Sequence, residues 1–261
     1  MVTRSNVPDG GGRMPEGEFF YFAIPAVIVL GLAKGGFTGL GALGLPLFAL
    51  GVNPIRAAAV LLPILIVQDV VSIIAYRRTW DGGVLRKMLP GAVAGVAIGW
   101  WFAASVSVGL VLAAVGAIAI LFGIYRLWRD HWSKDQRGAA WPLWSGGVFG
   151  LASGFTSQIA HAGGPPFQMW VMPQRLPRDV FVGTTAIFFA ALNWIKVPAY
   201  FALGQFTREN ILAALTLAPV AIVSSVLGVH LVRRVPPDKF YTLVYALLIV
   251  TGCKLLFDGL N

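Results

Sequence analysis

The chain has 261 residues, of which 57% are hydrophobic and 12% are charged, and its mean hydropathy is +0.75. A soluble domain carries about 25% charged residues, so the composition excludes a water-soluble globular protein and predicts an integral membrane protein. The net charge of +9 does not indicate nucleic-acid binding, because Lys and Arg gather in short loops, as the positive-inside rule expects of membrane proteins.

The N-terminal residues 1–18 contain three consecutive glycines, two prolines and three acidic residues. Acidic residues directly before an apolar run do not fit the positive n-region of a signal peptide. We therefore interpret residues 1–18 as a disordered tail and the apolar run after them as retained. The single cysteine, Cys253, excludes an internal disulfide and a cysteine metal cluster, and we expect neither a metal nor a cofactor.

The first apolar stretch is interrupted. Residues 19–33 are apolar, Lys34-Gly35-Gly36 follow, and a second apolar piece covers residues 37–52. Each piece is shorter than the roughly 20 residues of a spanning helix, which indicates two half-helices that meet at glycine-rich backbone. Beyond them we expect spans at 57–76, 88–104 and 108–126, a repeat of the broken pattern at 143–173, and final spans at 180–203, 210–232 and 240–257.

The two broken stretches are copies of one pattern. Gly-Leu-Ala begins both at Gly31 and at Gly150, and further matches follow in the same order: Phe37-Thr38 with Phe155-Thr156, Gly44, Pro46 and Phe48 with Gly163, Pro165 and Phe167, Asp69 with Asn193, and Tyr76 with Tyr200. Such a long repeat is typical of a duplicated half-transporter. We therefore divide the chain into a first membrane repeat at 19–126, a basic cytoplasmic linker at 127–141 and a second membrane repeat at 142–258.

Loop charges predict how the two repeats are oriented. If each broken element returns to the face it entered, the loops at 77–87, 126–137, 175–178 and 233–239 share one side and carry four, four, two and three Lys and Arg, whereas the opposite short loops carry only Arg56 and Arg208. The positive-inside rule favours this arrangement over a single crossing. The fold class that follows is an all-α integral membrane protein of two inverted repeats, each a broken-helix hairpin followed by three transmembrane helices, with both termini outside.

The broken elements are also the predicted binding site. Unwound backbone in a bilayer is tolerated only where protein or a water-filled cavity satisfies its polar groups, and half-helix N-termini present N–H groups that suit an anion. The alternative, close helix packing at small residues, explains Gly95 and Gly99 better than it explains the polar breaks. We expect these residues to bind the substrate: Lys34, Gly35, Gly36, Thr38, Gly41, Thr156, Ser157, Gln158, His161, Gly163, Gly164 and Asn193.

Four ionisable residues at membrane depth each allow two interpretations. Lys34 can attract an anion or extend to the interface, and His161 can serve the anion and proton coupling or stay neutral at a helix end. Asp69 can carry protons or pair with Lys34 or Lys196, and for Lys196 the pairing interpretation ranks slightly ahead. Asp69 and His161 are thus the candidates for proton coupling.

The duplicated G-L-A-x-G, F-T and G-x-P pattern resembles the TauE/SafE family of sulfite exporter-like permeases over about residues 20–257. The resemblance implies transport of small sulfur oxyanions or organosulfonates linked to an ion gradient. We expect a secondary transporter of the bacterial inner membrane, exporting sulfite, sulfonates or organosulfur acids by proton-coupled alternating access, with a passive anion channel as the alternative. Its expected partners are the anion and the lipid bilayer, and a homodimer is compatible with the sequence. We expect no enzyme, because Ser157 and His161 lack an orienting acid.

Overall fold

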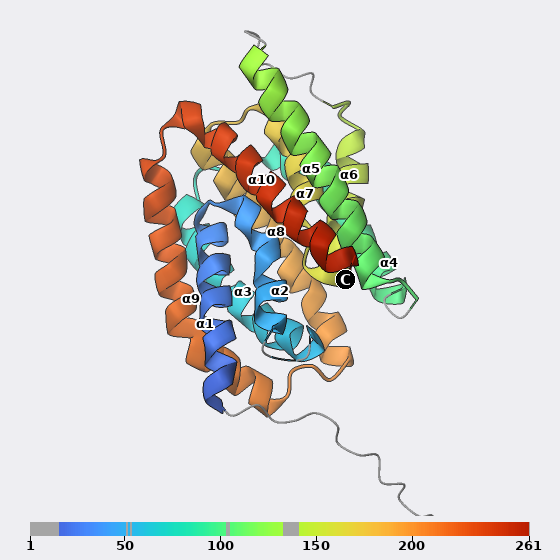
Figure 1. Ribbon diagram of the computed structural model, residues 1–261, viewed down its shortest axis with the longest axis vertical. Helices are drawn as coiled ribbons and strands as arrows, with labels where there is room; N and C mark the ends of the chain where they lie inside the picture. Colours follow the sequence, from blue (N-terminus) through green and yellow to red (C-terminus); the bar gives the residue numbers. More distant parts are fainter. Residues whose placement is uncertain (1–15, 51, 53, 103–104, 133–140, 261) are drawn as a thin grey trace, which may run out of the picture.

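The computed structural model describes residues 16–50, 52, 54–102, 105–132 and 141–260, and the regular elements within them are all helices (Figure 1). In chain order they are α1 (Glu16–Gly35), η1 (Thr38–Leu43), α2 (Gly44–Ala49), α3 (Pro54–Tyr76), α4 (Gly82–Phe102), α5 (Val108–Trp132), α6 (Ser145–Ala160), α7 (Gly164–Val171), η2 (Met172–Gln174), α8 (Arg178–Ala202), α9 (Arg208–Arg234) and α10 (Pro237–Leu260). Residues 1–15 of the predicted tail and 133–140 of the predicted linker lie outside the described residues. Helix α1 already begins at Glu16.

The described part contains five helices that are long and apolar enough to cross a membrane, namely α3, α5, α8, α9 and α10. The apolar part of α1, Phe19–Gly35, is shorter. Helix α4 does not belong to the five, because Arg86, Lys87 and several glycines lower its mean hydropathy. The chain is an all-helical membrane protein, as its composition predicted.

The first broken element is a returning hairpin. The chain turns after α1 at Gly36, whose φ of +145° is one that residues with a side chain rarely adopt. Helix α2 then runs back along α1, since a Cβ added at Gly44 would lie 2.3 Å from Leu30 Cγ. At the open end of the hairpin the rings of Phe48 and Phe19 are 5.4 Å apart.

The second broken element has the same shape. Helix α6 ends at Ala160 and is followed by its C-cap residue His161, which has a left-handed φ of 53°. Across the turn, Ser153 Oγ donates to the Gly163 carbonyl at 2.7 Å, and at the open end Trp170 Nε1 donates to Ser145 Oγ at 3.0 Å. In each element the two outer ends therefore lie side by side, so each element is a hairpin that returns to the end where it began.

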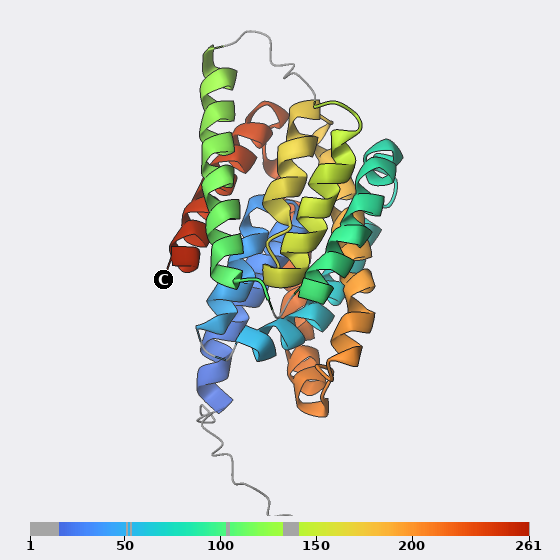
Figure 2. The same ribbon diagram turned by 90° about the vertical axis from the view of Figure 1, so that its right-hand side faces the viewer.

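Each hairpin packs against a helix from the other half of the sequence. Helix α1 lies beside α9 in Figure 1, and α4 lies beside α6 in Figure 2. Glycine permits this closeness: a Cβ added at Gly91 would lie 2.0 Å from the Gly147 oxygen, and one at Gly35 would lie 2.4 Å from the backbone of Gly228. The two halves are thus interlocked through α1–α9 and α4–α6.

Corresponding long helices of the two halves run antiparallel. In the α5–α10 pair, added Cβ atoms at Gly109 and Gly116 would lie 3.0 and 2.6 Å from the oxygens of Gly259 and Gly252 respectively. Residue numbers therefore rise along one helix as they fall along the other. Helices α3 and α8 are related in the same way, because their middles meet where Asn193 donates to Asp69 and the last turn of α3 reaches the first turns of α8.

Candidate functional site

A cavity of about 80 Å³ lies between the turns of the two hairpins and the middles of α3 and α8. Its polar lining consists of Lys34, Thr38, Ser157, His161, Thr185, Asn193 and Lys196. Its small and apolar lining consists of Leu30, Ala33, Gly41, Leu45, Leu61, Leu65, Gly164, Ala186 and Phe189. One water needs only about 10–15 Å³, so the cavity has room for a small solute with a polar and an apolar side.

A buried ion pair forms one wall of the cavity. Lys34 Nζ contacts Asp69 Oδ1 at 2.5 Å, and Asn193 Nδ2 donates to Asp69 Oδ2 at 2.7 Å. Asp69 is 1% exposed, so its carboxylate is held inside the protein with both oxygens bonded. Lys34 also lies 5.6 Å from the centre of the Phe189 ring. Of the alternatives that the sequence left open, the structure forms the Lys34–Asp69 pair, which links α1, α3 and α8.

A second buried lysine has a different partner. Lys196 is 1% exposed, and its Nζ donates to Ser157 Oγ at 3.2 Å. Within the part of the chain that the structure describes, its ammonium forms no ion pair with a carboxylate. The sequence favoured a paired Lys196, and Lys196 was not among the predicted site residues. A charged residue in the middle of an apolar span was the signal that could have identified it.

Two further side chains line the cavity with an unused polar atom. Thr38 Oγ1 and His161 Nε2 are buried and have no hydrogen-bond partner among the described residues. Buried polar groups are nearly always satisfied, so each of these atoms is available to a bound solute. The left-handed conformation of His161 sets the direction of its side chain at the turn between α6 and α7.

The predicted site residues divide into two groups. Of those predicted to bind substrate, Lys34, Thr38, Gly41, Ser157, His161, Gly164 and Asn193 line the cavity. The others have local roles: Gly35 packs on α9, Gly36 forms the first turn, and Gly163 precedes α7. Thr156 Oγ1 donates to a carbonyl one turn earlier at 2.8 Å, and Gln158 packs against Gly99 of α4. Among the described residues, no group of three His, Cys, Asp or Glu could hold a metal.

Aromatic rings pack above the cavity, toward the end of the molecule where α8 begins. Phe189, which lines the cavity, lies 5.5 Å from Phe167 and 5.2 Å from Phe188 between ring centres. Phe181, two helical turns earlier, lies 6.5 Å from Phe167 and 5.8 Å from Phe240. These rings join α7, α8 and α10 into an apolar layer on this side of the cavity.

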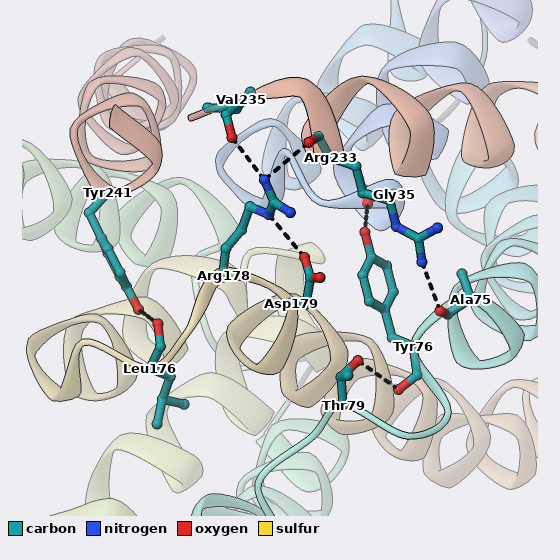
Figure 3. A network of polar contacts seen from close by, with 10 residues as sticks. All are labelled: Gly35, Ala75, Tyr76, Thr79, Leu176, Arg178, Asp179, Arg233, Val235 and Tyr241. Carbon is teal, nitrogen blue, oxygen red and sulfur yellow. Dashed lines mark hydrogen bonds and ion pairs between the residues drawn. The ribbon is translucent and has the colours of Figure 1, made fainter. Parts of the chain in front are cut away.

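Beyond the aromatic layer, a polar network joins four elements (Figure 3). Arg178 Nη1 donates to the carbonyls of Arg233 and Val235 at 3.2 and 2.8 Å. Arg233 in turn donates to a carbonyl in the last turn of α3 at 3.1 Å, and Tyr76 donates to the Gly35 carbonyl at 3.0 Å. The start of α8, the α9–α10 connection and the ends of α3 and α1 therefore meet at one end of the molecule, which we name the basic face.

Comparison with known proteins identifies the family. Residues 23–255 match the family model described as Sulfite exporter TauE/SafE. The probable inner membrane transporter protein TsaS of Comamonas testosteroni is 26% identical over 174 residues, which cover 66% of this chain and 70% of the relative. No solved structure matches. The family match spans both halves of the helical fold and confirms the resemblance carried by the duplicated glycine pattern. The chain belongs to the TauE/SafE family of membrane transporters, and it is a transporter rather than an enzyme.

Proposed function

We propose that the chain is a secondary transporter that exports a small sulfur-containing anion across a bacterial inner membrane. The observation that carries this proposal is the charge of the cavity: it is lined by Lys34 and Lys196, and a single carboxylate, Asp69, lies against it among the described residues. A buried excess of positive charge favours a bound anion. The family's description as a sulfite exporter and the relative's name as an inner membrane transporter support the substrate class and the membrane.

The anion lies between the two lysines in this proposal. The Ser157 and Thr38 hydroxyls are close enough to the cavity to donate to its oxygens, because both residues line it. The amide of Asn193 uses one N–H on Asp69 and has a second one to offer. The site thus draws ligands from both hairpins and from α8, which makes it dependent on the relative position of the two halves.

We further propose that the halves are inverted repeats. Three observations support this relationship: α3 and α8 are antiparallel, α5 and α10 are antiparallel, and each hairpin packs on a helix of the other half. An inverted pair placed around a central site is the arrangement from which alternating access follows by rocking one half against the other.

The proposed topology has the basic face in the cytoplasm and both termini outside. The contacts of Arg178 bring two of the predicted basic loops together. A third joins them through α10, because Arg126 Nε donates to Tyr245 Oη at 3.0 Å and Arg175 lies 5.8 Å from the Tyr245 ring. Together with the α3–α4 loop, these segments carry most of the loop Lys and Arg, which the positive-inside rule assigns to the cytoplasm.

For the coupling of transport to protons, the geometry favours His161 over Asp69. Both carboxylate oxygens of Asp69 are bonded, to Lys34 and to Asn193. His161 Nε2 instead faces the cavity without a partner among the described residues. The unpartnered ring nitrogen can bind a proton or release it as the anion enters and leaves.

The test uses purified protein in liposomes with an imposed pH gradient and radiolabelled sulfite and methanesulfonate. A transporter accumulates the anion against its own gradient, and accumulation collapses when the pH gradient is removed. Flux that only runs downhill would favour the channel alternative. Lys196→Gln should abolish flux. Lys254→Gln is the control, because Lys254 is an ion-paired lysine on α10 that lies outside the cavity lining, and this variant should retain flux. His161→Asn should keep anion binding and lose the response to the pH gradient.

A further inference from the structure

We propose that the cavity selects singly charged anions and rejects doubly charged anions of the same shape. This inference rests on the proposed function, since it concerns the substrate class of the same site. It follows from the number of fixed charges at the cavity and from what surrounds them.

The fixed charges of the described cavity sum to one positive charge. Its lining contains two ionisable amines, those of Lys34 and Lys196, and one carboxylate, that of Asp69, lies directly behind Lys34. With the lysines protonated and the carboxyl ionised, one positive charge is left over. The imidazole of His161 adds none in its neutral form. One negative charge on the ligand therefore balances the site.

Asp69 stays beside Lys34 whatever enters the cavity. The carboxylate is 1% exposed and bonded on both oxygens, by Lys34 and by Asn193. Its two partners come from two other helices, α1 and α8, so the carboxylate cannot turn away to solvent as a surface carboxylate could. A ligand approaching Lys34 meets an amine whose charge is already largely balanced, and Lys196 supplies the unbalanced one.

The surroundings solvate a surplus charge less well than bulk water does. Apart from the polar side chains that would bind the anion, the cavity is lined by apolar residues, among them Leu30, Leu61, Leu65 and Phe189. A charge left unbalanced among apolar side chains loses its hydration without gaining a partner. A dianion would leave one negative charge in that position, and a neutral solute would leave one positive charge, so the singly charged ligand is favoured over both.

Three solutes of nearly the same shape test this directly: dimethyl sulfone, methanesulfonate and sulfate carry no charge, one charge and two charges. Binding to the purified full-length protein is measured by calorimetry at about pH 6, where methanesulfonate still carries one charge and sulfate two, and at constant ionic strength. We expect methanesulfonate to bind at least roughly tenfold more tightly than sulfate, as an unbalanced charge at close range in a site of low polarity requires, and dimethyl sulfone to bind more weakly than methanesulfonate.

Asp69→Asn changes the sum to two positive charges while keeping the size of the side chain. We expect the affinity of sulfate relative to methanesulfonate to rise roughly tenfold in this variant. Asp258→Asn is the matched control, because Asp258 also pairs with a lysine, Lys254, but outside the cavity lining. The control should leave the ratio unchanged.

Lys196→Gln gives a second test that does not depend on the folding of the Asp69 variant. It lowers the sum to zero, so methanesulfonate should lose its advantage over dimethyl sulfone. Equal binding of methanesulfonate and sulfate by the unaltered protein, or an unchanged ratio in folded Asp69→Asn, would overturn charge selection and leave the proposed transport intact. Failure of sulfite, methanesulfonate and sulfate all to bind would instead contradict the proposed function.

Discussion

Arg178→Gln should open the cavity toward the basic face. The Arg178 side chain bonds to two backbone carbonyls of the α9–α10 connection, those of Arg233 and Val235, and to the carboxylate of Asp179 at 2.9 Å. In the proposed alternating-access mechanism, the start of α8 would separate from this connection when the cavity opens toward the basic face. We therefore expect Arg178 to stabilise the closed state, as a latch does.

The structure sets the size of the effect. A hydrogen bond from a charged group contributes about 1.5–3 kcal/mol when buried, and the Arg178 side chain is 17% exposed. Glutamine can replace one of the bonds but carries no charge. We therefore expect the closed state to lose about 1–3 kcal/mol, which corresponds to a roughly 5–150-fold change in the ratio of open to closed molecules.

The single native cysteine makes the assay direct. In a Cys253→Ala background, Ala186→Cys places a thiol in the cavity lining, and a membrane-impermeant thiol reagent is added from each face of oriented liposomes. Arg178→Gln should raise the modification rate from the basic face within that range and leave the rate from the opposite face unchanged or lower. Arg234→Gln, exposed in the last turn of α9, is the control. An unchanged rate, or an equal rise from both faces, would refute the latch.

Three further predictions concern the elements that hold the site in place. Tyr76→Phe removes the bond to the Gly35 carbonyl, worth about 0.5–1.5 kcal/mol, and should give a smaller rise in the same thiol assay. Gly95→Leu drives a side chain into α6, since even a Cβ would lie 2.1 Å from the Leu151 oxygen. Thermal unfolding in detergent should therefore show a loss of stability of about 1–3 kcal/mol. Gly147→Ala is the control and should keep its stability, because a single atom lies near the Gly147 Cβ position. His161→Asn should melt near the parent, whereas His161→Val should lose about 1–2 kcal/mol, because a β-branched residue resists the left-handed backbone.

The positions of the helices and of their breaks could be predicted from the sequence, because in a membrane protein each is indicated by the composition of a short stretch of chain. Apolar runs of sufficient length, each with at most one Asp, Glu, Lys or Arg, predicted α3, α5, α8, α9 and α10. Glycine-rich polar stretches predicted both hairpin turns. The loop charges favoured a returning hairpin in each half over a single crossing, because charge in membrane proteins is sorted by side.

The partners of individual residues could not be predicted in the same way. Gly35 was expected near the anion, but its closest neighbour is Gly228, almost two hundred residues later, and no local pattern announces that contact. The sequence does not distinguish a glycine at a helix break from a glycine at a helix crossing. Likewise Lys34 and Lys196 each had Asp69 as an available counter-ion in the sequence, and only the folded arrangement gives the carboxylate to Lys34.

The interlocking of the halves connects these packing glycines to the proposed mechanism. Helix α1 packs against α9 and helix α6 packs against α4, with the backbones too close to admit a Cβ at Gly35 or Gly91. In the proposed mechanism, one half would rock against the other about these close glycine crossings. Lys34 at the end of α1 belongs to the first half, and the Lys196–Ser157 pair of α8 and α6 belongs to the second. Rocking of the halves would change the distance between Lys34 and this pair, and would thereby couple the geometry of the anion site to the conformation of the transporter.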